Sequence, residues 1–450
     1  MEQTKNARGY FDTLRHMVRA LRGWNYSLFF VGQGLSLIGT WMQGAALGWL
    51  IYRLTGSKLM LGLVGFAGQI FSFLVSPFAG VLTDRWNRHR MLIAMQALSM
   101  LQAVLLAAVA FRAHVDVWHI VALVTFLGLV NAVDIPNRQA FVADLVERRE
   151  DLPNAIALNS FAFNGARLVG PALAGVVIFL SSEGACFVIN AVSYLAVIGA
   201  LLAMRITPRP QRPRRHLLHD LKEGFLYSFG FPPIRYVLLN LALMGLVAMP
   251  YAVLIPVFAR DILKGDAVTQ GLLISAAGVG AIVGALFLAS RKSVLGLGRL
   301  VAAAPALLGA GLIAFSLSRF LWLSLPMLMV VGFAQMVQMA GSNTILQTIV
   351  DDDKRGRVMS FYTIAFMGTT PFGNLAAGAL AQRFGAPLTL ICGAVICILA
   401  SAAAVASLPL LRRHVRPIYV KMGLLSETPP IPLAAEDIDI RNKVSRPGSA

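Results

Sequence analysis

The sequence predicts an all-α integral membrane protein with twelve transmembrane helices in two six-helix bundles. The first observation is composition: of 450 residues, 57% are hydrophobic and only 13% are charged, whereas a soluble domain carries about 25% charged residues. The second is a series of almost uncharged apolar runs, each near the length that crosses a ~30 Å hydrocarbon core. The third is a polar interval at 205–234 that separates six of these runs from another six.

The apolar runs define the spans in order. We place them at 27–52, 59–82, 91–111, 117–141, 155–180, 185–204, 235–258, 268–290, 300–317, 321–349, 358–382 and 386–408. A helix rises 1.5 Å per residue, so about 20 residues are needed for one crossing. Because the connectors are short, successive spans run antiparallel. An even number of spans places both ends of the chain on one side of the membrane.

The positive charges indicate which side that is. With both termini in the cytoplasm, about 30 of the 39 Lys and Arg residues lie on the cytoplasmic side, about seven lie outside and two lie within spans. Cytoplasmic loops of membrane proteins carry such an excess of Lys and Arg. We therefore predict a multi-pass protein of the bacterial inner membrane with both termini cytoplasmic.

The chain divides into five segments. Residues 1–25 place arginines between apolar side chains, the pattern of a cytoplasmic amphipathic helix on the inner leaflet; a basic tail without structure fits equally well. The two bundles occupy 26–204 and 235–408, and a linker rich in proline and arginine, 205–234, joins them in the cytoplasm. Residues 409–450 are rich in proline and charge without periodicity, so we predict a disordered cytoplasmic tail.

Several classes of function are excluded by what the sequence lacks. The net charge of +18 is spread over connectors and tails rather than gathered on one face, which argues against nucleic-acid binding. The cysteines, Cys186, Cys392 and Cys397, lie in apolar runs without the spacing of a metal site or a disulfide framework. No phosphate-binding loop and no Ser-His-Asp order occurs. We predict no enzymatic activity, no metal and no cofactor.

The two halves are weakly similar to each other. An acidic and basic loop, a Ser-Phe pair and an intramembrane proline in 144–171 recur in 351–371, at an offset of about 200 residues. Duplicated halves are how many secondary transporters build a site at the bilayer midplane between two moving bundles. The repeat therefore favours a transporter with its site between the halves.

A charged turn joins the second and third spans. It reads G-x-L-x-D-R-x-x-R-x-R from Gly80 to Arg90 and includes Asp84, Arg85 and Arg88. This pattern resembles the signature between helices two and three of the major facilitator superfamily. The resemblance implies that Gly80, Asp84, Arg85 and Arg88 form a conformational gate, with Asp84 tied to the outward-open state. The alternative is a static helix-end cap that also signals topology.

Few charges lie within the spans, where each costs at least ~2.5–3.5 kcal/mol to insert. Asp134 and Arg138 are four residues apart on one helical face, so they can pair with each other, or Arg138 can reach Asp84. Asp134 is the only carboxylate well inside a span. It is therefore the one embedded candidate for carrying a proton, and a fixed ion pair that holds the helix in place is the alternative.

Arg167 is the third embedded charge. It precedes Gly170 and Pro171 in a segment similar to the Gly-Pro signature of span five in antiporter members of the superfamily, although alanines occupy earlier glycine positions of that signature. The proline and small residues predict a kinked, closely packed helix with a conformational role. An arginine facing a cavity would favour anionic or polyphenolic substrates. Pairing with Asp134 or with an acidic loop residue is the alternative.

Polar side chains in several spans are candidates for lining a central cavity. Mixed with methionine and aromatic side chains, they suit a bulky amphipathic ligand, although some will bond across helices instead. The candidates are Gln33, Thr40, Gln43, Asn131, Asn164, Arg167, Asn240, Tyr251, Gln335, Gln338 and Asn343.

The sequence around Asp134 (D-x-P-x-R-Q-A-F) and around Arg167 (G-A-R-x-V-G-P) resembles the superfamily branch that contains the enterobactin exporter and macrolide-efflux proteins. The resemblance covers about 20–408. It implies proton-driven export of a bulky amphipathic molecule, siderophore-like or antibiotic-like, by a monomer with alternating access and lipids around it. The alternatives are an uptake carrier, a flippase for a lipid or metabolite, and a non-transporting membrane scaffold that recruits partners through its C-terminal tail.

Overall fold

The computed structural model describes most of the chain from residue 19 to residue 425. The described ranges are 19–85, 87–146, 148–205, 217–291, 293–351 and 353–425, with no description of the side chains of 76–86, 149 and 217–222. Most of the predicted amphipathic segment 1–25, the centre of the linker and the end of the tail thus lie outside the described residues. So do the side chains of Asp84 and Arg85 and the surroundings of Gly80 in the charged turn.

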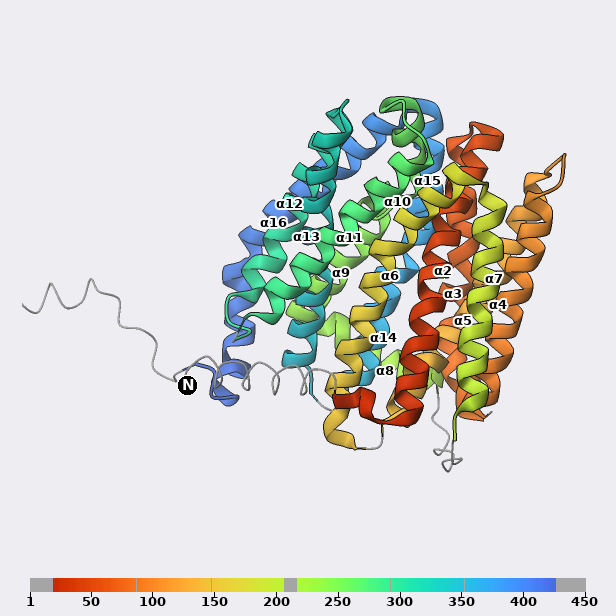
Figure 1. Cartoon of the computed structure of the whole chain (residues 1–450). Coiled ribbons are helices and arrows are strands. Elements are labelled where there is room, and N and C mark those ends of the chain that lie inside the picture. Colours follow the sequence, from red (N-terminus) through yellow and green to blue (C-terminus); the bar gives the residue numbers. More distant parts are fainter. Residues whose placement is uncertain are drawn as a thin grey trace, which may run out of the picture.

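The N-terminal half consists of a short 3-10 helix, η1 (Arg19–Arg22), and six long helices (Figure 1). The six are α2 (Trp24–Thr55), α3 (Lys58–Arg85), α4 (Arg88–Ala110), α5 (Val117–Leu145), α6 (Leu152–Leu180) and α7 (Glu183–Ala203), with the 3-10 turn η2 (Arg149–Asp151) before α6. Polar side chains begin several of them. Asn87 accepts from two amides of α4, and Asp116 and Ser182 cap α5 and α7, which satisfies amides that have no partner in the helix.

The C-terminal half begins with α8 (Leu217–Gly230), which lies within the predicted linker. Its spans include two interrupted helices. The elements are α9 (Pro232–Val247), α10 (Tyr251–Val257) and the π-helix η3 (Phe258–Ile262); α11 (Ala267–Ala289); α12 (Leu297–Leu317); α13 (Leu321–Ile349); α14 (Arg355–Thr363), the π-helix η4 (Ile364–Gly368) and α15 (Thr370–Phe384); and α16 (Ala386–Lys421).

Each of the twelve predicted spans corresponds to one helix or one interrupted helix. Within the described residues, ten helical stretches are long and apolar enough to cross a membrane, and α2 and the α14–α15 segment complete the set of twelve. One expectation needs correction: residues 409–421, predicted as part of a disordered tail, continue α16. The physical reason is packing, because Val415, Ile418 and Tyr419 contact a buried cluster of the C-terminal half.

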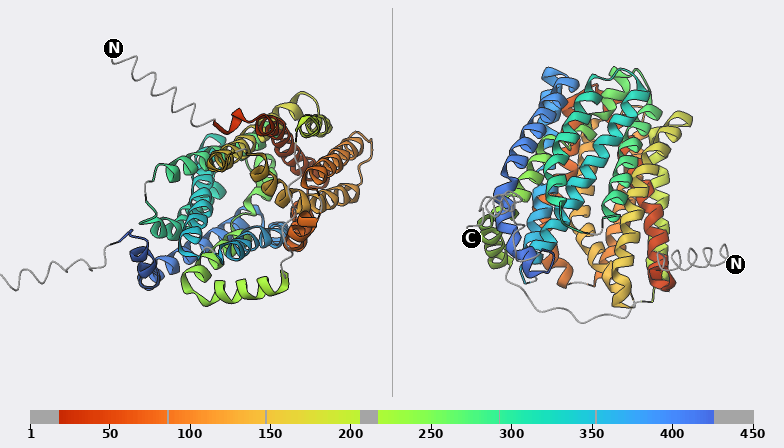
Figure 2. Two further views of the ribbon diagram at one scale, coloured as in Figure 1. Left: turned by 90° about the horizontal axis from the view of Figure 1, so that it is seen from below. Right: turned by 90° about the vertical axis from the view of Figure 1, so that its left-hand side faces the viewer.

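The two halves meet along two seams. Helix α3 packs against α15, and α6 packs against α11; seen along the bundle, α2 to α7 and α9 to α16 form two neighbouring groups (Figure 2). Glycines allow the close approach. A Cβ on Gly62 would lie 2.5 Å from the Asn374 carbonyl oxygen, and one on Gly271 would lie 2.4 Å from the Pro171 carbonyl oxygen. Small residues at helix contacts are typical of membrane bundles.

The apolar core is distributed unevenly between the two ends of the bundle. We call the end of the bundle where α2 begins and where α7 and α16 end the terminal end, and the opposite end the distal end (Figure 1). At the distal end, one buried cluster contains side chains of both halves, among them Trp49 and Leu254. At the terminal end, the described residues form two separate clusters, one in each half. Among the described side chains, the halves therefore share an apolar core only at the distal end.

Candidate functional site

Arg167 lies near the middle of α6, where the two halves meet. Its Nη2 donates a hydrogen bond to Oε1 of Gln335 on α13, at 3.1 Å. The guanidinium carbon lies 5.9 Å from the ring centroid of Trp41 on α2, within the range of a cation–π contact. The buried Tyr251 of α10 also interacts with this guanidinium. The structure thus brings together three predicted site residues, Arg167, Gln335 and Tyr251, from both halves.

Apolar and aromatic groups surround these polar groups. The Gln335 amide nitrogen lies 3.0 Å from the Met249 sulfur, which is a weak acceptor. Phe163 packs edge-on against Trp41, with 5.7 Å between ring centroids. We call Trp41, Phe163, Arg167, Met249 and Gln335 the central cluster. Met249 was not predicted, because its place in the cluster depends on the break between α9 and α10 rather than on any local pattern.

Asp134 and Arg138 form an ion pair inside the N-terminal half. The Arg138 Nη2 lies 2.6 Å from the Asp134 Oδ2, and Gln96 of α4 donates to the other carboxylate oxygen at 2.9 Å. The Asp134 side chain is 3% exposed and that of Arg138 is 21% exposed. Of the partners proposed from the sequence, the structure therefore shows Asp134 beside Arg138, and it does not pair Asp134 with Arg167.

The charged turn between α3 and α4 is described only in part. Arg88 lies 2.9 Å from an oxygen of Asp144 at the end of α5, and its carbonyl oxygen accepts from the Asn137 amide at 3.0 Å. The side chains of Asp84 and Arg85 and the surroundings of Gly80 are not described. The gate expected at this turn stays a prediction, with Arg88 as its described member.

Three of the predicted cavity residues form hydrogen bonds to neighbouring helices of their own half. Gln43 is 3% exposed, and its amide bonds Gln102 at 3.0 Å and Asn190 at 2.8 Å between α2, α4 and α7. Gln338 donates to Asn240 at 3.1 Å between α13 and α9. Gln43, Asn240 and Gln338 thus bond across helices of their own half, and their role in lining a cavity stays a prediction.

The remaining predicted polar residues are spread over both halves. Gln33 is buried and Asn131 is half-buried. The others form hydrogen bonds within their own helices, which use part of their hydrogen-bonding capacity. The pairs are Thr40 with Ser36, Asn164 with Ser160 and Asn343 with Gln347.

Gly170 and Pro171 lie where α6 touches two helices. A Cβ on Gly170 would lie 2.7 Å from the Cβ of Trp41, so glycine lets α6 approach α2. The Pro171 carbonyl faces Gly271 across the seam with α11. This pair therefore sets the packing of α6 on both sides, directly distal to Arg167.

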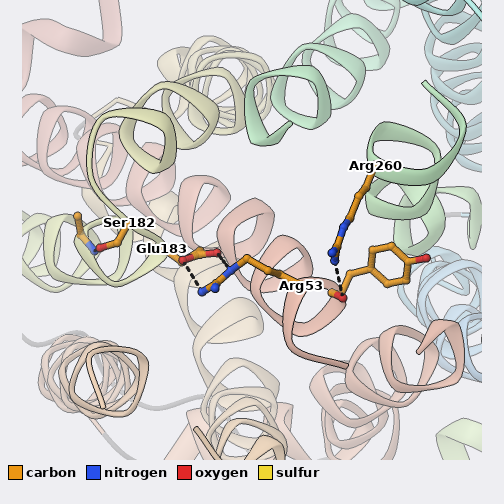
Figure 3. Close-up of polar contacts among 6 residues, drawn as sticks. Arg53, Ser182, Glu183 and Arg260 are labelled. Atoms are coloured by element: carbon orange, nitrogen blue, oxygen red, sulfur yellow. Dashed lines mark hydrogen bonds and ion pairs between the residues drawn. The ribbon is translucent and has the colours of Figure 1, made fainter. Parts of the chain in front are cut away.

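A second group of polar contacts lies at the distal end (Figure 3). Arg53 at the end of α2 makes a bidentate ion pair with Glu183 of α7, at 2.7 and 3.1 Å. Tyr52 links the halves, because its hydroxyl donates to Asp261 and its carbonyl oxygen accepts from Arg260 at 3.4 Å. We call Tyr52, Arg260 and Asp261 the distal tie. Sequence reasoning missed it, since these residues lie at span ends that only the folded chain brings together.

A twelve-span bundle in two packed halves, with polar groups of both halves meeting at mid-depth, defines a membrane transporter of the major facilitator type. The chain belongs to the transmembrane secretion effector family of that superfamily, whose family model matches residues 19–417. Its family is one of multi-pass membrane transporters, and this chain is therefore such a transporter.

Curated relatives are similar over most of their length. The staphyloferrin A transporter of Staphylococcus aureus is 25% identical over 360 residues, covering 79% of this chain and 89% of the relative. The multidrug efflux pump Tap of Mycolicibacterium fortuitum is 25% identical over 369 residues, covering 80% and 88%. The enterobactin exporter of Escherichia coli is 25% identical over 370 residues, covering 81% and 86%.

Solved structures share the fold. A bacterial homolog of the human lysosomal transporter Spinster, in an inward-facing and occupied conformation, matches with a TM-score of 0.69 at 15% identity, covering 88% of this chain and 98% of that chain. A peptide transporter of the POT type matches with a TM-score of 0.72 at 11% identity, covering 87% and 95%.

Proposed function

We propose that this protein exports a bulky amphipathic small molecule, siderophore-like or antibiotic-like, from the bacterial cytoplasm across the inner membrane. The observation that carries the proposal is the central cluster, in which polar, aromatic and thioether groups of both halves meet at mid-depth. Such a mixture suits an amphipathic ligand. The printed names of the relatives, which describe transport of siderophores and efflux of drugs, support the same class of substrate.

Alternating access is the mechanism that we propose. The excess of positive charge supports a cytoplasmic terminal end. With this orientation, the distal tie and the shared core close the described form to the outside. Export requires the bundles at 26–204 and 235–408 to part at the distal end and close at the terminal end, with the linker 205–234 joining them. In this proposal the Asp84 turn closes the terminal end of a monomer.

Proton antiport is the proposed driving force. Within the described spans, Asp134 is the carboxylate at depth, and it contacts Arg138 and Gln96. A proton on Asp134 would release Arg138. If Asp134 and Arg138 instead form a fixed pair, a gradient other than that of protons drives transport. The uptake carrier and the flippase are alternatives of this kind.

The test is efflux from bacterial cells that lack their major efflux pumps. Cells with and without the protein are loaded with catecholate siderophores, macrolides and cationic dyes, and efflux is followed with and without an uncoupler. We expect at least one compound to leave faster with the protein and to slow with the uncoupler. Faster accumulation would favour the uptake alternative, and no difference for any compound would contradict the proposal.

The scaffold alternative has its own test. Deleting residues 426–450 removes the end of the chain beyond α16 and leaves the described helices intact. A transporter keeps its efflux rate after this deletion, whereas a scaffold that acts through its tail loses its function.

A further inference from the structure

The charge on Arg167 differs from the other charges at depth in the kind of partners it has. Its described contacts are with Gln335, Trp41 and Tyr251, all of which are neutral. Among the described residues, no ion pair involves Arg167. The other arginine at depth, Arg138, is neutralised by Asp134 at 2.6 Å. A cation near the middle of a membrane span is costly unless it is paired or solvated.

The guanidinium keeps donors free for a ligand. Arginine carries five N–H donors in a planar fork that matches a carboxylate with two parallel hydrogen bonds. The contacts with Gln335 and Tyr251 leave part of this fork unused, and Arg167 is only half-buried. The donor is thus both charged and accessible.

Gln335 offers a second donor from the other half. Its amide oxygen accepts from Arg167, so its amide nitrogen points away, toward the sulfur of Met249 at 3.0 Å. A thioether is a weak acceptor, and an anionic oxygen would be a better partner for this N–H. Arg167 on α6 and Gln335 on α13 can therefore hold one anionic group between the halves.

We infer that the transported molecule is an anion whose carboxylate or phenolate group binds Arg167 and Gln335, with its aromatic or apolar body against Trp41 and Phe163. This inference rests on the proposed function and narrows its substrate class. The ligand supplies the counter-charge that the described residues do not. Charge-assisted hydrogen bonds of this kind are the strong ones in proteins.

The test is a binding titration with two dyes of the same xanthene framework and opposite charge. Fluorescein carries a carboxylate and a phenolate, and rhodamine 123 is a cation. Each is titrated with the full-length protein in lipid nanodiscs, and binding is read by fluorescence anisotropy. We expect the wild type to bind fluorescein at least about tenfold more tightly than rhodamine 123, because one charge-assisted contact corresponds to about this factor.

Variants assign that preference to one side chain. Arg167→Gln should abolish the preference for fluorescein, and Arg167→Lys should retain part of it because the charge remains. The matched control is Arg235→Gln, which removes an equal charge from an exposed position at the start of α9 and should leave the preference intact. Equal affinity for the two dyes in the wild type, or an unchanged preference in Arg167→Gln, would overturn the inference.

Efflux of the same two dyes separates this inference from the proposed function. Efflux of fluorescein that Arg167→Gln abolishes supports both. Efflux of rhodamine 123 without fluorescein overturns the anion inference and leaves the exporter proposal standing. Tight binding of fluorescein without efflux of any tested compound supports the anion site and counts against export.

Discussion

The seam between α6 and α11 predicts that a single methyl group will open the distal end. In Gly271→Ala the new Cβ would lie 2.4 Å from the Pro171 carbonyl oxygen, whereas real Cβ contacts essentially never fall below 3.0 Å. The obstacle is backbone, so a side-chain rotation cannot relieve it. The two helices must separate by at least about 0.6 Å. In the proposed alternating-access cycle, opening of the distal end breaks this contact.

The size of the effect follows from the cost of overpacking. Adding a methyl group to a closely packed contact costs about 1–3 kcal/mol. Because Gly271 and Pro171 belong to different halves, this energy falls on the equilibrium between the two access states rather than on the folding of either half. We expect the population of the distal-open form to rise by about 5-fold to 150-fold.

The assay is the distance between spin labels at the distal end of the two halves, measured by double electron–electron resonance. Labels are attached through Arg112→Cys and Arg319→Cys, both in exposed connectors, with the exposed Cys392 replaced by serine. Gly271→Ala should move the distance distribution to longer values. The control is Gly44→Ala, whose Cβ has no neighbour within 4 Å. A folded Gly271→Ala protein with an unchanged distribution would refute the reasoning.

A glycine inside one half should behave differently. A Cβ on Gly332 of α13 would lie 1.9 Å from the Ala277 carbonyl oxygen of α11, and both helices belong to the C-terminal half. Gly332→Ala should therefore lower the yield and melting temperature of the protein. A shift of the access equilibrium without loss of stability would contradict this distinction.

Three further substitutions test contacts described above. Tyr52→Phe removes the hydrogen bond to Asp261 and should raise the distal-open population by about tenfold; an unchanged spin-label distribution would argue against the distal tie. Arg138→Gln leaves the buried Asp134 without its counter-charge and should cost about 3–5 kcal/mol of stability. Adding Asp134→Asn to this variant should restore much of the melting temperature, and an Arg138→Gln protein as stable as the wild type would contradict this. Gln43→Leu should lower the melting temperature, at about 1–3 kcal/mol for its two stranded amide partners, without changing dye preference.

The spans were predictable because the length of an apolar run is a strong local signal. The side of its helix on which an individual residue lies was not predictable. Gln43 and Gln338 lie on helices that are apolar on almost every side, since both lipid and core favour apolar groups, so no periodicity shows which face is internal. Arg167 could be located at mid-depth by counting residues, but its contact with Gln335 joins positions 168 residues apart.

At the end of α16, composition predicts less structure than the chain has. Composition predicts disorder from 409, because proline and charge dominate there. The helix nevertheless continues to Lys421, since apolar residues such as Val415 and Ile418 pack against a buried cluster of the C-terminal half that the linear pattern does not reveal.

The π-helix η3 has a consequence for register. The wide turn, in which the amide of Leu263 bonds the carbonyl of Phe258, accommodates one more residue than an α-helical turn. Each residue turns a helix by about 100°, so deleting one residue here would rotate Arg260 and Asp261 relative to α2. A related protein with this deletion would keep all of its spans and its hydropathy profile and yet lack the link from Tyr52. Insertions and deletions in this single turn are therefore the changes to look for when related chains are aligned.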